Sequence, residues 1–227
     1  MPYSKCLENY FKGNIIKKFL LFFLLFILNI SLMGCKLESH SRIKLSQLSG
    51  AETKIDSIIK VEITSCHPHD DNNSPSTDLL KANDTINKLF DESEFLECKN
   101  ENMDTFASYN VPMTVGTFDG NISNTKGISV LKNKDNVYFL VSEKIRKFIK
   151  QSDDFKLLAV IRVVNDLGKN VIIYPNAVYV DKVPFAGLTG WKLNKEILSG
   201  KSAELKISNV SSDFAIENGY VPIFSIN

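Results

Sequence analysis

The chain has 227 residues, of which 44% are hydrophobic and 23% are charged, and its net charge is +1. These values are ordinary for a globular protein, so the chain can bury a core of its own. Residues 1–34 carry four lysines and one glutamate, a charge of +3, which leaves −2 on the remainder. A mildly acidic body lacks the basic face that nucleic-acid binding requires, so nucleic acid is excluded as an expected partner.

A basic flank and a short apolar run occupy the first part of the chain. Lys17 and Lys18 precede Phe19–Leu28, in which all ten residues are apolar. A helix that spans a bilayer needs about 20 apolar residues, and this run stops at Asn29. The layout therefore predicts a secretory signal rather than a permanent membrane anchor.

The sequence Leu32-Met33-Gly34-Cys35 follows the apolar run. It resembles the lipobox of bacterial lipoproteins, although Met33 departs from the small or β-branched residue that is common at its position. With a Phe-rich signal and a body rich in Lys and Asn, the chain is most similar to spirochaete-type lipoproteins. The resemblance implies a signal peptide over residues 1–34, a diacylglyceryl group on the Cys35 thiol, and a lipid anchor in the cell envelope at the outer membrane surface. The alternative is an uncleaved membrane anchor with an incidental cysteine.

The segment after the lipobox is predicted to be a flexible tether over residues 35–54. Polar residues dominate it, with only scattered Leu and Ile. A coil of this length would hold the folded body roughly 25 Å from the membrane. Residues 55–227 are predicted to form a single globular domain that is mostly β from about residue 111.

The first half of this domain mixes strand and helix signals. Alternating apolar residues predict a strand over 55–64, and apolar residues at helical spacing predict a helix over 76–90. The acidic segment 91–104 is predicted to be a frayed turn. Residues 111–118 have the character of a strand, and Asp119-Gly120 after them is a hairpin signal.

The second half is dominated by strand patterns. A short helix is predicted over 142–151, with Ser142 as its cap and Ile145, Phe148 and Ile149 as its inner stripe. Residues 155–164 are apolar enough for a central strand covered on both faces, and Pro175 predicts a bulge, an edge or two short strands within 171–180. Further strands are predicted over 136–141, 203–208 and 220–226.

This succession of predicted strands and turns predicts a mainly β fold, namely an antiparallel immunoglobulin-like sandwich with one or two inserted helices. The segments LLAVIRVVNDLGKN and LSGKSAELKISNV resemble the immunoglobulin-like modules of exported bacterial proteins. The inserted helices leave an α+β fold as the alternative.

Two cysteines, Cys66 and Cys98, belong to the predicted domain. An exported protein meets an oxidising compartment, so the two are candidates for a disulfide. The alternative is two separate thiols, one of which would be a metal ligand.

The segment CHPHDD, residues 66–71, is a candidate metal site. Two histidines separated by one residue on extended backbone point to the same side, which suits a transition metal with His67, His69 and Asp70 as ligands. Structural zinc sites normally carry paired ligands at other spacings. A solvated loop of turn-forming residues is therefore the competing interpretation.

A second candidate is the segment 184–193, which contains Phe185, Leu188 and Trp191. Aromatic residues dominate the binding energy of protein interfaces, so these three could contact a partner. They could equally close the open end of their own core.

The sequence contains no G-x-S-x-G, H-E-x-x-H or G-x-G-x-x-G motif, so a non-enzymatic protein without a cofactor is predicted. The expected function is that of a surface-displayed lipoprotein that binds or adheres to a host or envelope protein. The alternative is a periplasmic lipoprotein that binds a metal or small ligand through residues 66–71.

Overall fold

The computed structural model describes residues 36–69, 71, 73–120, 125–152, 155–185 and 193–226. They belong to one compact unit, Cys35–Asn227, which is distinct from Met1–Gly34. Within the described ranges, no helix is long and apolar enough to cross a membrane. The predicted signal peptide over residues 1–34 and the predicted lipid-bearing Cys35 lie outside the described residues.

Among the described residues, three α-helices and one 3₁₀ helix interrupt a succession of strands. In order they are β1 (Lys36–Lys44), the 3₁₀ helix η1 (Leu45–Ser49), β2 (Thr53–Ile63), α2 (Thr77–Leu89), β3 (Glu94–Glu101), β4 (Asp104–Thr117), β5 (Ile128–Asn133), β6 (Asn136–Val141), α3 (Glu143–Gln151), β7 (Lys156–Val164), β8 (Val171–Pro175), β9 (Val178–Val180), β10 (Val183–Phe185), β11 (Lys195–Ile197), β12 (Ser202–Ile207), α4 (Asn209–Asn218) and β13 (Tyr220–Ile226).

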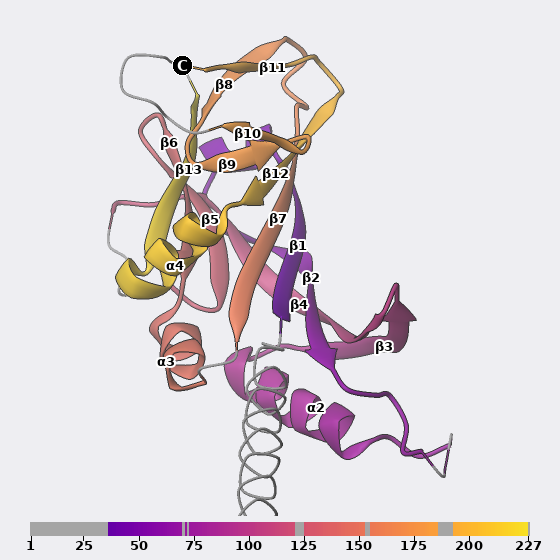
Figure 1. Cartoon of the computed structure of the whole chain (residues 1–227). Coiled ribbons are helices and arrows are strands. Elements are labelled where there is room, and N and C mark those ends of the chain that lie inside the picture. Colours follow the sequence, from indigo (N-terminus) through magenta and orange to yellow (C-terminus); the bar gives the residue numbers. More distant parts are fainter. Residues whose placement is uncertain are drawn as a thin grey trace, which may run out of the picture. The chain divides into compact units, whose positions relative to one another are not determined.

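The described strands form one curled sheet (Figure 1) in the order β10-β9-β12-β7-β1-β2-β4-β5-β6-β13-β8-β11, and β3 pairs with β4 beside this path. The mainly β class with a few helices is therefore confirmed. The wholly antiparallel arrangement is not observed, because β1 pairs with β7 and β4 pairs with β5 in parallel. The sheet is thus mixed.

The prediction of a flexible tether over residues 35–54 is wrong for the described residues. Lys36–Lys44 form β1, which lies between β2 and β7 and is in register with β7 along its whole length. The inward positions of β1 are Leu37, Ser39, Ser41 and Ile43, and the two serines are 2% and 8% exposed. Serine at these positions hides the apolar alternation that identifies a strand, and the neighbouring strands supply the pairing.

Most of the other predicted elements are confirmed. β2, β6, β7, β12 and β13 lie where strands were expected, and α2 and α3 match the two predicted helices. The segment around Pro175 divides into two short strands, β8 and β9, which pair with different neighbours. The outer side chains of β7 are half-buried or exposed, so the expectation that both of its faces are covered is wrong.

Three further segments differ from expectation. Residues 94–101 are not a frayed turn but the strand β3, paired with β4. The connection after β4 is not a hairpin, because β5 runs parallel to β4. The helix α4 falls in a segment where no helix was expected, and its inward side includes Ser211 and Ser212 instead of a continuous apolar stripe.

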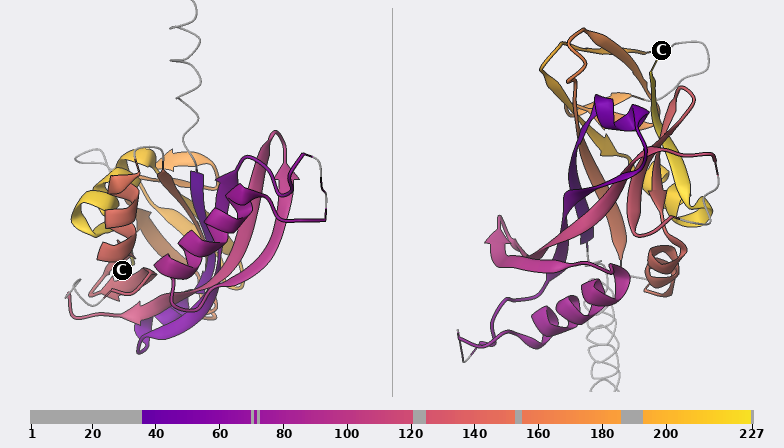
Figure 2. Two further views of the ribbon diagram at one scale, coloured as in Figure 1. Left: turned by 90° about the horizontal axis from the view of Figure 1, so that it is seen from below. Right: turned by 180° about the vertical axis from the view of Figure 1, so that it is seen from behind.

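The core lies on the inner face of the curled sheet. Inward side chains of the central strands, such as Ile43, Ile59 and Ile161, are at most 1% exposed. Seen from below (Figure 2), α2 crosses in front of the sheet while α3 and α4 lie together at one side. Each buried aliphatic side chain contributes roughly 1.5–3 kcal/mol of transfer free energy, so alternation along the central strands drives the sheet to curl around its own apolar face.

Candidate functional site

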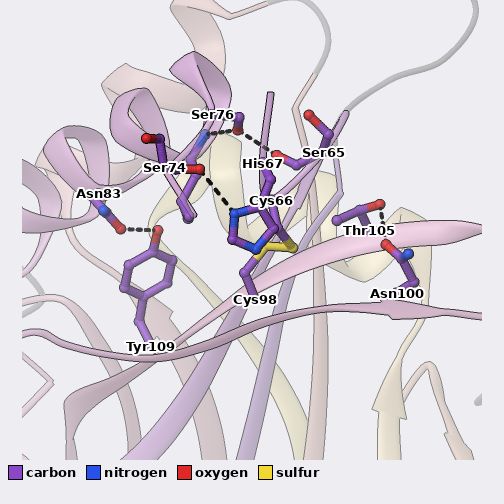
Figure 3. The surroundings of a disulfide bond; sticks show 11 residues. Ser65, Cys66, His67, Ser74, Ser76, Asn83, Cys98, Asn100, Thr105 and Tyr109 are labelled. Carbon is purple, nitrogen blue, oxygen red and sulfur yellow. Dashed lines mark hydrogen bonds between the residues drawn. A yellow bond between two sulfur atoms is a disulfide. The ribbon is translucent and has the colours of Figure 1, made fainter. Parts of the chain in front are cut away.

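Cys66 and Cys98 form a disulfide with a sulfur–sulfur distance of 2.06 Å and a Cα–Cα distance of 5.7 Å (Figure 3). The bond joins the segment after β2 to the edge strand β3. The predicted pairing is therefore present, and neither sulfur is available as a thiolate ligand for a metal.

The loop that follows Cys66 satisfies its polar groups locally. The His67 ring Nδ1 donates to the Ser74 carbonyl oxygen at 2.9 Å. The Asp71 carboxylate accepts from the Ser74 hydroxyl and from the Asn73 amide, and these hydrogen bonds lower the pKa of Asp71. The Ser76 hydroxyl accepts from the Leu79 amide at 3.1 Å and so caps α2.

These contacts favour a structured polar loop over a metal site. Across the described residues, no group of three or more His, Cys, Asp or Glu side chains is placed to hold a metal ion. His67 and His69 lie exposed in the loop, and Asp70 lies outside the described residues. The described residues therefore do not support metal binding in the loop after Cys66.

Of the three residues in the second predicted site, the structure describes one. Phe185 ends β10 and packs, partly buried, against the core. Leu188 and Trp191 lie outside the described residues. Phe185 thus fits the interpretation as a core side chain better than that as a partner contact.

A groove of about 440 Å³ opens where α3 begins. Its walls come from segments that are distant in sequence: β2, the end of α2, β4, residues 125–127 and the first turn of α3. Apolar side chains, Leu89, Phe90 and Pro112, form part of the lining. This volume falls within the range of about 300–1,000 Å³ that is usual for small-ligand sites.

Ser142 occupies the N-cap position of α3, as predicted, but its hydroxyl does not cap the helix. The residue is 6% exposed, and its Oγ atom is buried without a hydrogen-bond partner in the described structure. Ser76 and Ser208, at the corresponding positions of α2 and α4, both accept a backbone N–H. The start of α3 therefore retains backbone donors and an unused hydroxyl beside the groove, and helix N-termini favour anionic groups.

The backbone of residues 125–127 lies directly against the start of α3. The Ser142 amide donates to the Gly127 carbonyl oxygen at 2.9 Å. Gly127 has φ +61°, and a Cβ added to it would lie 3.5 Å from the Phe90 ring. A left-handed conformation at this point suits glycine, so the close approach of residues 125–127 to α3 depends on this residue.

Charged side chains border the groove in pairs. The Lys54 and Glu92 side chains are 2.7 Å apart, and those of Lys144 and Asp91 are 3.8 Å apart. The Glu143 carboxylate accepts from Lys147 at 2.6 Å, and this bond lowers the pKa of Glu143. Exposed ion pairs contribute about 0–1 kcal/mol each, so a ligand with a carboxylate or phosphate group can exchange partners with these lysines at little cost.

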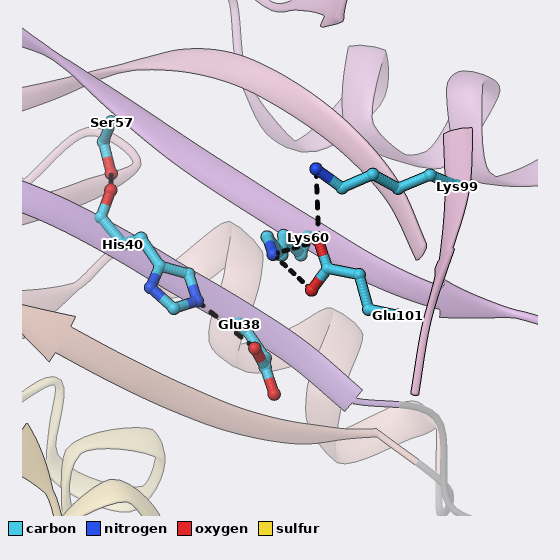
Figure 4. Close-up of polar contacts among 6 residues, drawn as sticks. All are labelled: Glu38, His40, Ser57, Lys60, Lys99 and Glu101. Atoms are coloured by element: carbon cyan, nitrogen blue, oxygen red, sulfur yellow. Dashed lines mark hydrogen bonds and ion pairs between the residues drawn. The ribbon is translucent and has the colours of Figure 1, made fainter. Parts of the chain in front are cut away.

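A second polar region lies on the outer face of the sheet (Figure 4). Glu38 and His40 on β1 are 3.2 Å apart, and this contact lowers the pKa of Glu38. Lys60 on β2 contacts Glu101 on β3 at 2.7 Å. The sequence prediction missed this region because it treated β1 as a tether and β3 as a turn. A charged edge strand of this kind discourages pairing with a second sheet.

Together, the curled mixed sheet and the groove define a mainly β domain with a small-ligand-sized hollow at the start of a helix. The chain belongs to the family described as a domain of unknown function (DUF7424), which it matches over residues 37–227. No curated protein and no solved structure matches the chain.

Proposed function

We propose that the protein is a lipid-anchored lipoprotein of the cell envelope with a non-enzymatic binding role. The observation that carries this proposal is the position of Cys35. The first strand of the domain begins at Lys36, and the family match begins at residue 37. Cleavage before Cys35 would therefore remove the signal-like segment and leave the folded domain whole, with a lipid at its first residue.

The disulfide supports the export that this proposal requires. Disulfides persist in oxidising compartments and are rare in the cytosol. The Cys66–Cys98 bond joins the segment after β2 to β3, so it suits a protein that folds outside the cytosol. Display on the outer membrane surface, with a host or envelope protein as partner, follows from the resemblance to spirochaete-type lipoproteins.

Lipid attachment is tested by growing cells with radiolabelled palmitate and measuring the label on the protein. We expect the Cys35→Ala variant to lose the label and to keep the signal segment. Cys6→Ala is the matched control, because Cys6 lies in the segment that is removed, and it should leave labelling unchanged. Label on the Cys35→Ala variant, or a mature amino terminus other than Cys35, would overturn the proposal. Protease treatment of intact cells then tests surface display, since only displayed protein is cut.

The groove at the start of α3 is the place we assign to the binding role. Its test uses the lipid-free mature chain carrying Cys35→Ser and a panel of small carboxylates and phosphate esters. A ligand that binds the folded state alone raises the melting temperature, and the rise grows with the logarithm of ligand concentration once that concentration exceeds the Kd. We expect such a rise with at least one compound, and its loss in a Gly127→Val variant that still unfolds cooperatively. A rise that survives in this variant would place the binding site elsewhere.

A further inference from the structure

We infer that the end of the sheet at which β1 begins lies directly against the membrane, with no tether between the lipid and the fold. This inference rests on the proposed lipidation of Cys35. The partner surface is a phospholipid bilayer, and the covalent lipid holds this end of the domain against it.

Lys36 is fixed in the fold by its backbone and by its side chain. It pairs with Lys156 at the start of β7, and its amide donates to the Glu62 carboxylate at 3.2 Å. Its ammonium group lies 2.7 Å from the Asp104 carboxylate and 3.4 Å from that of Glu62. Cys35 is one peptide unit away, about 3.8 Å between Cα atoms. The lipid-bearing sulfur therefore stays within a side chain's length of this end of the sheet.

The register identifies what else lies at this end. β2 runs antiparallel to β1 and ends here, so the loop that leads to α2 starts at the same place. β4 runs antiparallel to β2 and begins here, so the turn between β3 and β4 lies close by. Figure 1 shows α2 and α3 at the same end.

Large apolar side chains are exposed on α2 and on the turn between β3 and β4. Leu80 on α2 is 51% exposed, and Met103 in the turn between β3 and β4 is 98% exposed. Met103 directly precedes Asp104, which binds Lys36. The opposite end of β1 lies eight residues further along the strand, roughly 26 Å away at 3.3 Å per residue. The turn at Ser199 lies near that far end, because Ser202 pairs with Val164 and Val164 pairs with Lys44.

The experiment measures the distance of each end from the lipid. The lipidated mature protein is placed in phosphatidylcholine vesicles that contain a lipid-borne quencher, with a fluorophore on one introduced cysteine: Leu80→Cys, Met103→Cys or Ser199→Cys. Intact mass checks that the Cys66–Cys98 disulfide survives labelling. We expect quenching at positions 80 and 103 to be several-fold stronger than at position 199.

A matched variant supplies the missing tether. Sixteen Gly and Ser residues inserted between Cys35 and Lys36 add a coil with a span of roughly 20–25 Å. We expect this insertion to abolish the difference between the three positions. Vesicle-bound protein with equal quenching at all three positions, or a difference that survives the insertion, would overturn the inference and leave the proposed lipid anchor standing. Failure of the protein to bind vesicles would overturn both.

Discussion

Removal of the Cys66–Cys98 disulfide should lower the stability of the domain substantially. The two cysteines are 32 positions apart, and the loop between them contains α2 and the first half of β3. In the chain-entropy account of cross-links, a loop of this length stabilises the folded state by about 3.7 kcal/mol at 25 °C. Whole domains are stable by about 5–15 kcal/mol. The double variant Cys66→Ala/Cys98→Ala should therefore lose a large part of its stability but still fold.

The measurement is urea denaturation of the lipid-free mature chain, with and without the double substitution. We expect the free energy of unfolding to fall by about 3–4 kcal/mol. Wild-type protein treated with a reductant is the control, since it also lacks the cross-link but keeps both sulfur atoms. Agreement between the reduced protein and the double variant would assign the loss to the cross-link. A loss below about 1 kcal/mol would refute the reasoning from loop length.

Three further predictions concern single side chains. Ser76→Ala should lower the free energy of unfolding by about 1 kcal/mol in urea denaturation, because it removes a helix cap. Ser142→Ala should lower it little or even raise it, because the buried hydroxyl has no partner in the described structure. Equal losses in the two variants would contradict this assignment. Burial raises the pKa of Tyr109 to about 12, so on raising the pH the unfolded chain loses the phenol proton before the folded chain does. The free energy of unfolding should therefore fall as the pH rises from 10 through 12, by up to about 2.7 kcal/mol. The same pH dependence in a Tyr109→Phe variant would show that it has another origin. Gly116→Ala should destabilise by about 1–3 kcal/mol, because the added Cβ would lie 2.7 Å from a backbone carbon, whereas at Gly50 the nearest atom would be 3.9 Å away; similar melting temperatures for the two variants would disprove this.

Local patterns predict the elements whose own residues carry the signal. α2 and α3 have apolar residues at helical spacing and a serine at the N-cap position. β12 alternates cleanly, with Ala203, Leu205 and Ile207 buried. The disulfide was accessible to prediction because the predicted domain contains just two cysteines.

The elements that were missed depend on their neighbours. β1 has serines at two of its inward positions, and β3 is an exposed, mostly polar strand that pairs with β4. Their strand structure comes from hydrogen bonds to partners that only the tertiary fold supplies. The parallel pairing of β4 with β5 likewise cannot be seen in the Asp119-Gly120 turn signal, because that signal describes the local backbone and not the direction of the next strand.

The groove illustrates the same limit for the candidate site. The sequence identifies Ser142 as a helix start. It does not show that Lys54, the end of α2 and residues 125–127 converge on that residue. Nor does it show that the Ser142 hydroxyl, unlike those of Ser76 and Ser208, leaves the helix uncapped.

The pairing of β1 with β7 constrains how the chain acquires its structure. β1 is made early, yet its partner follows 120 positions later, since Lys36 pairs with Lys156. Contacts between residues so distant in sequence slow folding, and until β7 arrives one edge of β1 has no partner. If Cys35 carries a lipid, β1 starts one residue after the lipidated position, so this long-range pairing would lie close to the membrane surface.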